Sequence, residues 1–282
     1  MRVSDWIRKA RFDPKLIKLA KLFNIHKYIK RMYCLFALRI NKKIKVVLLG
    51  YPAEFYVNSL EELLFIEGTL IDIRQREIDV LKKIFEVLGR GDVAYDIGAS
   101  MGSHTVFMAQ RVGKEGCVIA FEPRTNNYKE LMANINLNSL KNVTPINVAV
   151  GRHSGKESIY GYSEDSFGLF SIIRHKDDRY IEEVELVAGD VYIQDKHLPF
   201  PNVVKFDVEG YEYYVIQGLK ETLMQEKCRL VFCEIHPTLL PKEVTSEDVI
   251  SLLRSFGFNK VETYLRGDQI HTFCYKSNIK FE

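Results

Sequence analysis

Short apolar runs alternate with segments of helical periodicity over most of this chain of 282 residues. Strands are predicted at 92–97, 117–122, 143–150, 203–207 and 229–235, and helices at 103–112, 125–137, 211–219 and 246–256. Strands separated by single helices favour a parallel sheet with right-handed crossovers, which places the chain in the α/β class. Two further strands, at 259–264 and 271–276, follow each other without a helix and predict an antiparallel pair.

The regions outside this alternation divide the chain into parts. Residues 1–43 carry apolar side chains at roughly helical spacing among many basic ones, and predict a basic amphipathic helical extension. Residues 44–73 predict a β-hairpin around Gly50-Tyr51-Pro52 and a connecting segment. The main domain is then expected at 74–282, and within it residues 152–201 interrupt the alternation and predict a β-rich insertion.

The net charge of +3 hides an uneven distribution along the chain. Residues 1–45 contain 14 Lys or Arg residues against Asp5 and Asp13, so the remainder of the chain is acidic. A basic amphipathic segment is typical of a peripheral membrane contact or an acidic partner, and equally of a helix that packs on the main domain or on a second copy of the chain. The composition of the main domain gives no indication of nucleic-acid binding, and no nucleic-acid partner is expected.

The cysteines and the hydropathy of the chain indicate the cellular compartment in which the protein is expected. The five cysteines are scattered and form no C-x-x-C pair, so we expect reduced thiols in a cytoplasmic protein, with a membrane-peripheral variant allowed by the basic segment. No stretch reaches the ~18 uninterrupted apolar residues of a membrane span, and no signal peptide is expected.

A glycine turn joins the first predicted strand of the main domain to its helix. The segment Val93–Gly102 reads Val-Ala-Tyr-Asp-Ile-Gly-Ala-Ser-Met-Gly, with Asp96 near the strand end and Gly98 and Gly102 bracketing the turn. Glycine has no Cβ and tolerates positive φ, so such a turn lets the backbone approach a ligand closely.

The residues around this turn narrow the choice of ligand. Ser100 stands where a dinucleotide-binding fingerprint needs its second glycine, and the Gly-Lys-Ser or Gly-Lys-Thr of a P-loop does not follow. A phosphate group is therefore not the expected ligand. Asp96 can accept hydrogen bonds from an ammonium group, directly or through water. Glu122, at the end of the next strand, can accept both ribose hydroxyls. A ribose and an amino acid without phosphate describe S-adenosylmethionine.

Four blocks of the sequence together resemble the motifs of one protein family. They are Asp96-Ile97-Gly98-Ala99-Ser100-Met101-Gly102, Phe121-Glu122-Pro123, Asn147-Val148-Ala149-Val150-Gly151 and Val204-Lys205-Phe206-Asp207-Val208-Glu209-Gly210-Tyr211-Glu212. Over roughly residues 75–276 the chain resembles the FkbM family of class I S-adenosylmethionine-dependent methyltransferases. The resemblance implies a seven-stranded Rossmann-like sheet with an antiparallel last strand, and O-methylation of a hydroxyl in a sugar, glycolipid or small natural product.

The resemblance also implies roles for individual residues. Asp207, at the tip of the fourth strand, would face the sulfonium methyl, Glu122 would hold the ribose, and Val148 would flank the adenine. The expected cofactor contacts are Asp96, Gly98, Ala99, Ser100, Gly102, Glu122, Pro123, Val148 and Asp207. The acceptor, a small molecule or glycan, would meet the insertion at 152–201.

A base is needed because a sugar hydroxyl is a poor nucleophile until its proton is removed. The candidates are His236, Glu209 and Asp207. Glu234 and His236 share one side of an extended segment, as do Asp207 and Glu209, so these four could also hold a divalent cation, although none is expected. In the alternative structural interpretation, Glu209 caps the helix near Tyr211, and Glu234 and His236 form structural hydrogen bonds.

Two other functions stay open on the sequence alone. A nicotinamide-dependent oxidoreductase could use the same sheet, although Ser100 disfavours it. A non-catalytic membrane-surface or scaffold protein could retain a vestigial methyltransferase domain and act through residues 1–45. A homo-oligomer is compatible with each of these functions.

Overall fold

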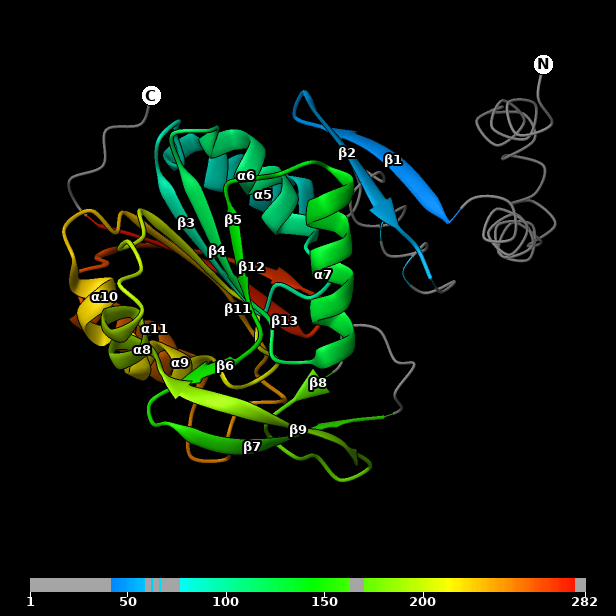
Figure 1. Cartoon of the computed structure of the whole chain (residues 1–282). Coiled ribbons are helices and arrows are strands. Elements are labelled where there is room, and N and C mark those ends of the chain that lie inside the picture. The colour runs from blue at the N-terminus through cyan, green and yellow to red at the C-terminus, as the bar shows by residue number, and fades with distance from the viewer. Residues whose placement is uncertain (1–41, 59–61, 63–65, 67–76, 163–169, 277–282) are drawn as a thin grey trace, which may run out of the picture.

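A computed structural model describes residues 42–58, 62, 66, 77–162 and 170–276 of the chain (Figure 1). The predicted basic extension, up to residue 41, therefore lies outside the described residues, as does most of the connecting segment before residue 77. Within the described ranges, no helix combines the length and the apolar character needed to cross a membrane.

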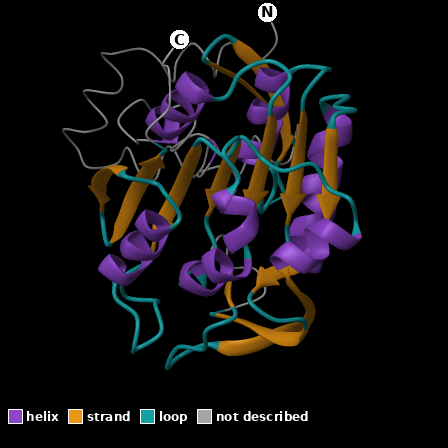
Figure 2. Ribbon diagram, turned by 90° about the vertical axis from the view of Figure 1, so that its left-hand side faces the viewer, coloured by secondary structure: helices purple, strands orange, loops and turns teal. Residues whose placement is uncertain are grey.

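A sheet of seven strands forms the centre of the fold, as the alternation predicts. In chain order the strands are β3 (Val93–Ile97), β4 (Cys117–Phe121), β5 (Val143–Ile146), β10 (Val203–Phe206), β11 (Leu230–Ile235), β12 (Lys260–Arg266) and β13 (Gln269–Tyr275). Their order across the sheet is β12-β13-β11-β10-β3-β4-β5 (Figure 2). Strands β3, β4, β5, β10 and β11 are parallel, whereas β13 runs antiparallel to β11 and β12. The predicted antiparallel last pair is confirmed.

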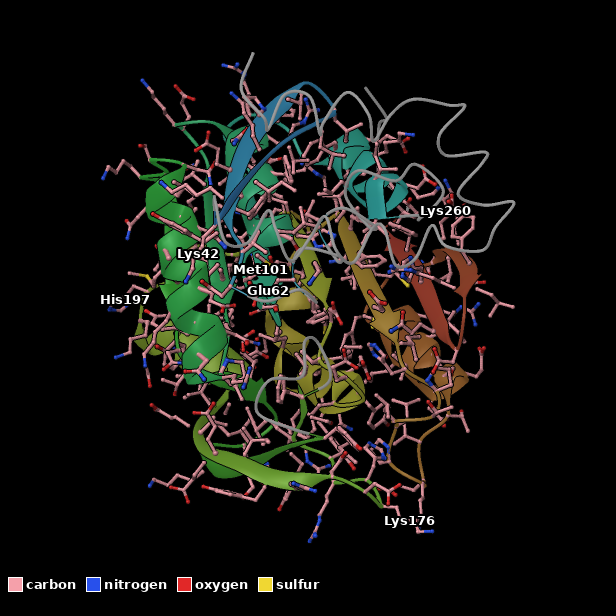
Figure 3. The ribbon with its side chains drawn as sticks, turned by 90° about the vertical axis from the view of Figure 1, so that its right-hand side faces the viewer. Lys42, Glu62, Met101, Lys176, His197 and Lys260 are labelled. Carbon is pink, nitrogen blue, oxygen red and sulfur yellow. The ribbon has the colours of Figure 1, made fainter. Side chains whose placement is uncertain are left out.

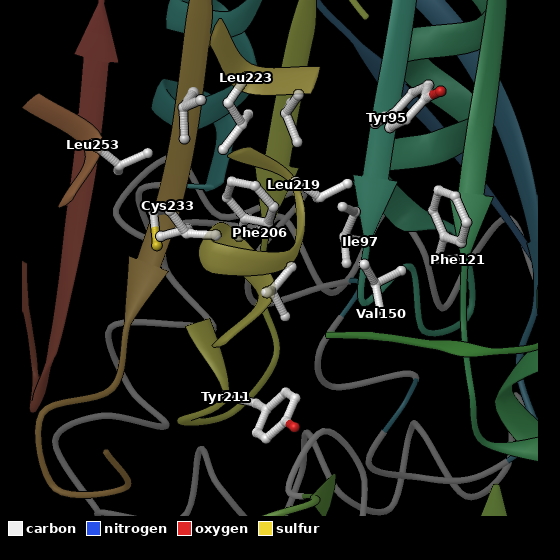
Figure 4. Packing of buried hydrophobic residues seen from close by; sticks show 14 of the residues in the cluster. Tyr95, Ile97, Phe121, Val150, Phe206, Tyr211, Leu219, Leu223, Cys233 and Leu253 are labelled. Atoms are coloured by element: carbon white, nitrogen blue, oxygen red, sulfur yellow. The ribbon is translucent and has the colours of Figure 1, made fainter. Parts of the chain in front are cut away.

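Helices cover both faces of this sheet. In chain order they are α5 (Glu77–Val87), α6 (Ser103–Val112), α7 (Thr125–Leu137), α8 (Gly189–Asp195), α9 (Glu212–Gly218), α10 (Lys220–Met224) and α11 (Ser246–Ser255). Neighbouring strand residues face opposite layers: Ala94 packs in the cluster of α5 and α6, and Tyr95 packs in the cluster of α9 and α11. Figure 4 shows the second cluster, in which Tyr95, Phe206 and Leu253 come from both sheet and helices. Burial on both faces explains why these strands read as nearly continuous apolar runs.

The predicted hairpin consists of β1 (Lys43–Leu48) and β2 (Tyr51–Tyr56), paired antiparallel. Gly50 has a φ of 85°, a left-handed conformation that suits glycine at a tight turn. Helix α7 anchors the second strand: the Asn138 side chain accepts a hydrogen bond from the Glu54 N–H at 2.9 Å and donates one to the Glu54 carbonyl at 2.7 Å. The hairpin thus packs beside α7 and α6 rather than on the main sheet (Figure 1).

The single strand predicted at 143–150 is wrong, because the chain leaves the main sheet within it. Strand β5 ends at Ile146, and β6 (Ala149–Gly151) belongs to a second sheet. Asn147 lies at the break and its side chain donates hydrogen bonds to the carbonyls of Glu122 and Pro123, at 2.8 and 2.9 Å. These bonds replace the strand pairing that Asn147 would otherwise continue, and they fix the loop after β4.

The second sheet has four strands in the order β6-β9-β7-β8, with β7 (Gly155–Gly161), β8 (Phe170–Ser171) and β9 (Arg179–Ala188). It lies beyond the carboxyl ends of the main strands (Figures 1 and 2). The region predicted as a β-rich insertion supplies three of its strands and also the helix α8, which was not predicted. Figure 3 shows Lys176 and His197, both exposed, at the periphery, whereas Met101 is buried inside.

Candidate active site

A cavity of about 300 Å³ lies at the carboxyl ends of β3, β4 and β10, under the second sheet. This is the edge where ligands bind in open α/β sheets. Nine of the residues predicted from sequence line it: Gly98, Ala99, Ser100, Glu122, Pro123, Val148, Asp207, Glu209 and Glu234. Asp96, Gly102 and His236 do not line the cavity, and their contacts place them behind its wall.

The glycine turn packs tightly against the loop after β10. Gly98 has a φ of 81°, and a Cβ added to it would lie 1.8 Å from the carbonyl oxygen of Asp207. The N–H groups of Gly98 and Ala99 both donate to the carbonyl of Phe121 at 3.0 Å, which joins the turn to β4. The turn is therefore held on two sides, and any side chain at Gly98 would displace it.

Asp96 is fully buried, and both carboxylate oxygens are engaged by the protein. Oδ1 accepts a hydrogen bond from Lys205 Nζ at 3.0 Å, and Oδ2 accepts one from Thr105 Oγ1 at 2.6 Å. Lys205 also donates to the Gly98 carbonyl at 3.3 Å. Asp96 thus supports the glycine turn from beneath, through a lysine that sequence reasoning did not assign.

Lys205 is buried in β10 and lines the cavity. Burial alone lowers the pKa of an ammonium group, but the charges of Asp96 and Asp207 outweigh that effect and raise the Lys205 pKa above its usual value. Lys205 is therefore a permanent positive charge at the bottom of the cavity, with Asp207 Oδ2 at 3.7 Å.

Glu122 presents a carboxylate that two backbone groups orient. Oε2 accepts a hydrogen bond from the Ser100 N–H at 2.7 Å, and Oε1 accepts one from the Arg124 N–H at 3.0 Å. Burial raises the Glu122 pKa to about 7, even though these two hydrogen bonds act to lower it. Each carboxylate oxygen can accept a further hydrogen bond, so the geometry suits a pair of hydroxyl donors.

The second sheet contributes a contact that was not predicted from the sequence. The guanidinium of Arg124 lies 3.7 Å from the ring centroid of Phe170 in β8, and both residues line the cavity. Glu182 of β9 accepts hydrogen bonds from the N–H and the hydroxyl of Thr125, at 3.1 and 2.7 Å. These contacts hold the second sheet over the loop after β4, and so over the cavity.

A cluster of acidic residues around one histidine lies next to this cavity. His236 Nε2 is 3.3 Å from Glu209 Oε2 and 4.0 Å from Asp207 Oδ1, and Nδ1 is 2.8 Å from Glu212 Oε1. Three of the residues predicted from sequence, Asp207, Glu209 and His236, are thus brought together. Glu212, which is completely buried, ends the fourth sequence block, but no role was predicted for it from the sequence.

The loop that presents Glu209 is conformationally constrained. Glu209 has a φ of 49°, in the left-handed region that costs a residue with a Cβ on the order of 1–3 kcal/mol. The Glu209 carbonyl accepts a hydrogen bond from Ser171 Oγ at 2.6 Å, and the next N–H, of Gly210, donates to Glu212 at 2.9 Å. The strained conformation directs Glu209 toward His236. Among the described residues, no side chain caps the start of α9, so the alternative structural interpretation, in which Glu209 caps this helix, is wrong.

The pKa values in this cluster follow from burial and mutual charge. Burial raises the pKa of Glu209 to about 8, against the lowering effect of His236. Burial lowers the pKa of His236, but the hydrogen bond to Glu212 and the charge of Glu209 outweigh it and raise the value to about 10. The carboxylates of Glu212 and Glu209 thus stabilise a positive charge at the position of His236.

Glu234 does not join this cluster. Its carboxylate lies 3.4 Å from His271 Nε2 in β13 and 3.7 Å from Arg266 in β12. Strand β11 ends at Ile235, and the His236 carbonyl then accepts hydrogen bonds from Leu239 and Leu240 in a turn. The alternation that would place Glu234 and His236 on one side therefore stops between them.

Comparison with known proteins identifies a family. The model of the FkbM methyltransferase domain matches residues 96–260, which is more than half of the chain. Hexuronic acid methyltransferase AglP of Haloferax volcanii is 29% identical over 196 residues, covering 70% of this chain and 75% of that protein.

Solved structures of other methyltransferases are also similar. FkbM methyltransferase from Methylobacillus flagellatus KT shares 14% identity at a TM-score of 0.45, over 65% of this chain and 43% of that one. An rRNA methylase from Streptococcus thermophilus shares 11% identity at a TM-score of 0.46, over 72% of this chain and 98% of that one.

The match with the family model begins at Asp96, ends at Lys260 in β12, and includes the glycine turn, Glu122 and the Asp207 cluster. It favours neither an oxidoreductase nor a scaffold protein. The chain belongs to the FkbM family of S-adenosylmethionine-dependent methyltransferases.

Proposed function

We propose that this protein transfers the methyl group of S-adenosylmethionine to a hydroxyl oxygen of a sugar, with a sugar acid as the first acceptor class to test. The observation that carries this proposal is the position of Asp207 and Glu209. Both line the cavity at the end of β10, and both lie within 4.0 Å of the same histidine nitrogen. A hydroxyl acceptor needs such a group, because its proton must leave as the new bond forms.

The cofactor would occupy the part of the cavity nearest the glycine turn. Ser100 and the backbone of Gly98 and Ala99 would contact its amino-acid end, with Asp96, Gly102 and Lys205 supporting the turn from behind. Glu122 would accept hydrogen bonds from the ribose hydroxyls, and Pro123 and Val148 would flank the adenine. This placement is supported by the residues that line one cavity together, which are Gly98, Ala99, Ser100, Glu122, Pro123, Val148 and Lys205.

In this proposal, catalysis depends mainly on alignment. S-adenosylmethionine supplies an electrophilic methyl group, so the protein has to hold the acceptor oxygen in line with the methyl carbon and its sulfur. Asp207 is the more exposed of the two carboxylates, with 32% of its side chain accessible against 16% for Glu209. Asp207 would take the hydroxyl proton and pass it to water, with Glu209 and His236 holding the acceptor site.

The acceptor class rests on the named relative and on the charges of the cavity. The relative is a hexuronic acid methyltransferase, and Arg124, Lys205 and Arg266 all line the cavity of this chain. A sugar carboxylate would be attracted to these basic groups, while its hydroxyls would face Asp207 and Glu209.

An acceptor panel tests the proposal. The full chain is incubated with methyl-labelled S-adenosylmethionine and, separately, with glucuronosides, the matching neutral glucosides and a short RNA. We expect label to enter the glucuronosides most rapidly, and Asp207→Asn to slow that transfer by at least 100-fold. Faster labelling of RNA, or equal labelling by wild type and Asp207→Asn, would show that the acceptor site is misassigned.

A further inference from the structure

Three side chains of metal-ligand type converge at the ends of β10 and β11. One ligand atom from each of Asp207, Glu209 and His236 lies within 4.8 Å of the other two. Metal–ligand bonds to oxygen and nitrogen are roughly 2.0–2.6 Å long, so atoms at this spacing can share one ion with little movement. Two carboxylates and one imidazole form a donor set that suits a divalent first-row cation such as Mn²⁺.

Two atoms at the centre of this group are unsatisfied. His236 is only 3% exposed, yet among the described residues its Nε2 has no hydrogen-bond partner, and the same is true of Glu209 Oε2. The two atoms lie 3.3 Å apart without the geometry of a hydrogen bond. Buried polar atoms in proteins are nearly always paired, so a pair left open on facing side chains indicates a missing partner between them.

The remaining nitrogen of His236 is held in a way that is typical of metal ligands. Nδ1 lies 2.8 Å from Glu212 Oε1, and the same oxygen accepts a hydrogen bond from the Gly210 N–H at 2.9 Å. Glu212 is completely buried and cannot turn away into solvent. A carboxylate that binds one ring nitrogen fixes the orientation of the ring and directs the other nitrogen at the ion.

The surrounding charge also favours a cation. Glu209 and Asp207 both face Nε2 of His236, and Glu212 adds a third carboxylate on the other side of the ring. Lys205 lies 3.7 Å from Asp207, but its hydrogen bonds go to Asp96 and to the Gly98 carbonyl. A positive ion among the three carboxylates would reduce their mutual repulsion in this buried position.

We propose that Asp207, Glu209 and His236 bind one divalent cation, and that this cation in turn binds the acceptor hydroxyl. The second half of this statement rests on the proposed function. Coordination lowers the pKa of a bound hydroxyl. Its O–H bond breaks and the proton leaves through Asp207 to water. The O–CH3 bond then forms as the CH3–S bond breaks, and the sulfonium becomes a neutral thioether.

Binding of Mn²⁺ alone to the full chain tests the site without cofactor or acceptor. Electron paramagnetic resonance of free Mn²⁺ gives affinity and stoichiometry. We expect one site in the wild type, and at least 10-fold weaker binding in Glu209→Gln and in Glu212→Gln. Glu234→Gln is the matched control, because Glu234 also contacts a buried histidine but lies outside the three-residue group. It should bind Mn²⁺ like the wild type.

Two results would overturn the inference: absence of saturable Mn²⁺ binding in the wild type, or equal affinity in wild type and Glu209→Gln. In either case the cation of the cluster is the protonated ring of His236. Thermal melting of each variant verifies the fold, and Glu209→Gln keeps the size and shape of the residue. Methyl transfer to a sugar that persists in a chelator would refute the cation while leaving the proposed function intact. Mn²⁺ binding without any sugar methylation would refute the proposed function while leaving the cation site intact.

Discussion

The carboxylate of Glu212 lies 2.8 Å from Nδ1 of His236, in a position where the carboxylate is completely buried. This contact sets the direction of the other ring nitrogen, which faces Glu209 and Asp207. In the proposed reaction, Glu212 would therefore act on the acceptor site without touching the acceptor. Its influence is through the orientation of a single imidazole ring.

Replacement of this positioning residue should affect turnover more than cofactor binding. In Glu212→Gln the amide keeps an oxygen for the Gly210 N–H but loses its charge beside His236. We expect kcat to fall about 10- to 100-fold with the KM for S-adenosylmethionine unchanged. Steady-state kinetics measure both values. A rise in that KM with unchanged kcat would place Glu212 in cofactor binding instead.

The ion pair between Lys205 and Asp96 should be a major contributor to stability. Lys205→Met would leave a buried carboxylate without its ammonium partner, which costs about 3–5 kcal/mol in the free energy of unfolding. Urea denaturation measures this cost.

The double variant Lys205→Met with Asp96→Asn is the control, since it removes both charges. It should recover part of the loss, because no uncompensated charge then stays buried. Equal destabilisation by the single and the double variant would show that the two residues act independently.

The glycine turn offers a test with an internal control. Gly98 and Gly91 have φ values of 81° and 82°, but a Cβ on Gly98 meets the Asp207 carbonyl at 1.8 Å, whereas a Cβ on Gly91 meets nothing within 4 Å. Both alanine variants pay about 1–2 kcal/mol for the left-handed conformation. Only Gly98→Ala should also abolish binding of S-adenosylmethionine, as calorimetry would show. Normal binding by Gly98→Ala would contradict the proposed cofactor position.

Glu122 should make cofactor binding depend on pH. Burial raises its pKa to about 7, and the ionised form is the better acceptor for two ribose hydroxyls, so affinity should increase between about pH 6 and about pH 8. Calorimetry across this pH range measures the affinity for the cofactor, and Glu122→Gln should remove its dependence on pH. A wild-type affinity that does not change with pH would refute the assignment.

The same group has the opposite effect on the stability of the free protein. A carboxyl whose pKa is raised on folding favours the neutral form of the folded chain. The stability that it contributes is therefore present below about pH 4.5 and is lost as the pH rises through about 7. Bound cofactor would offset this loss at higher pH.

Local patterns in the sequence were sufficient for most strands of the main sheet, for the glycine turn, and for the positions of Glu122 and Asp207 directly after their strands. These features depend on periodicity and on residues that are close in sequence, and the apolar runs were long enough to be recognised as strands. Asp207 and Glu209 were found because they follow a buried strand directly. The family motifs supplied the rest of the assignment.

Contacts between distant segments were not predictable in this way. Lys205 and Asp96 are adjacent only because β10 and β3 pair in register, although 109 positions separate them in sequence. The exit of the chain from the main sheet at Asn147 depends on carbonyls of another loop. Glu234 and His236 separate because the strand ends between them, at a boundary that apolar spacing does not mark.

The most direct test of the proposed reaction is the position of the transferred methyl group on a sugar acid. The full chain is incubated with S-adenosylmethionine that carries a ¹³C-labelled methyl group and with a glucuronoside, and the product is analysed by NMR. We predict a methyl ether on a ring hydroxyl, formed by the wild type and strongly reduced in Asp207→Asn. A methyl ester on the carboxylate would contradict the account, because an ionised carboxylate has no proton for Asp207 to remove.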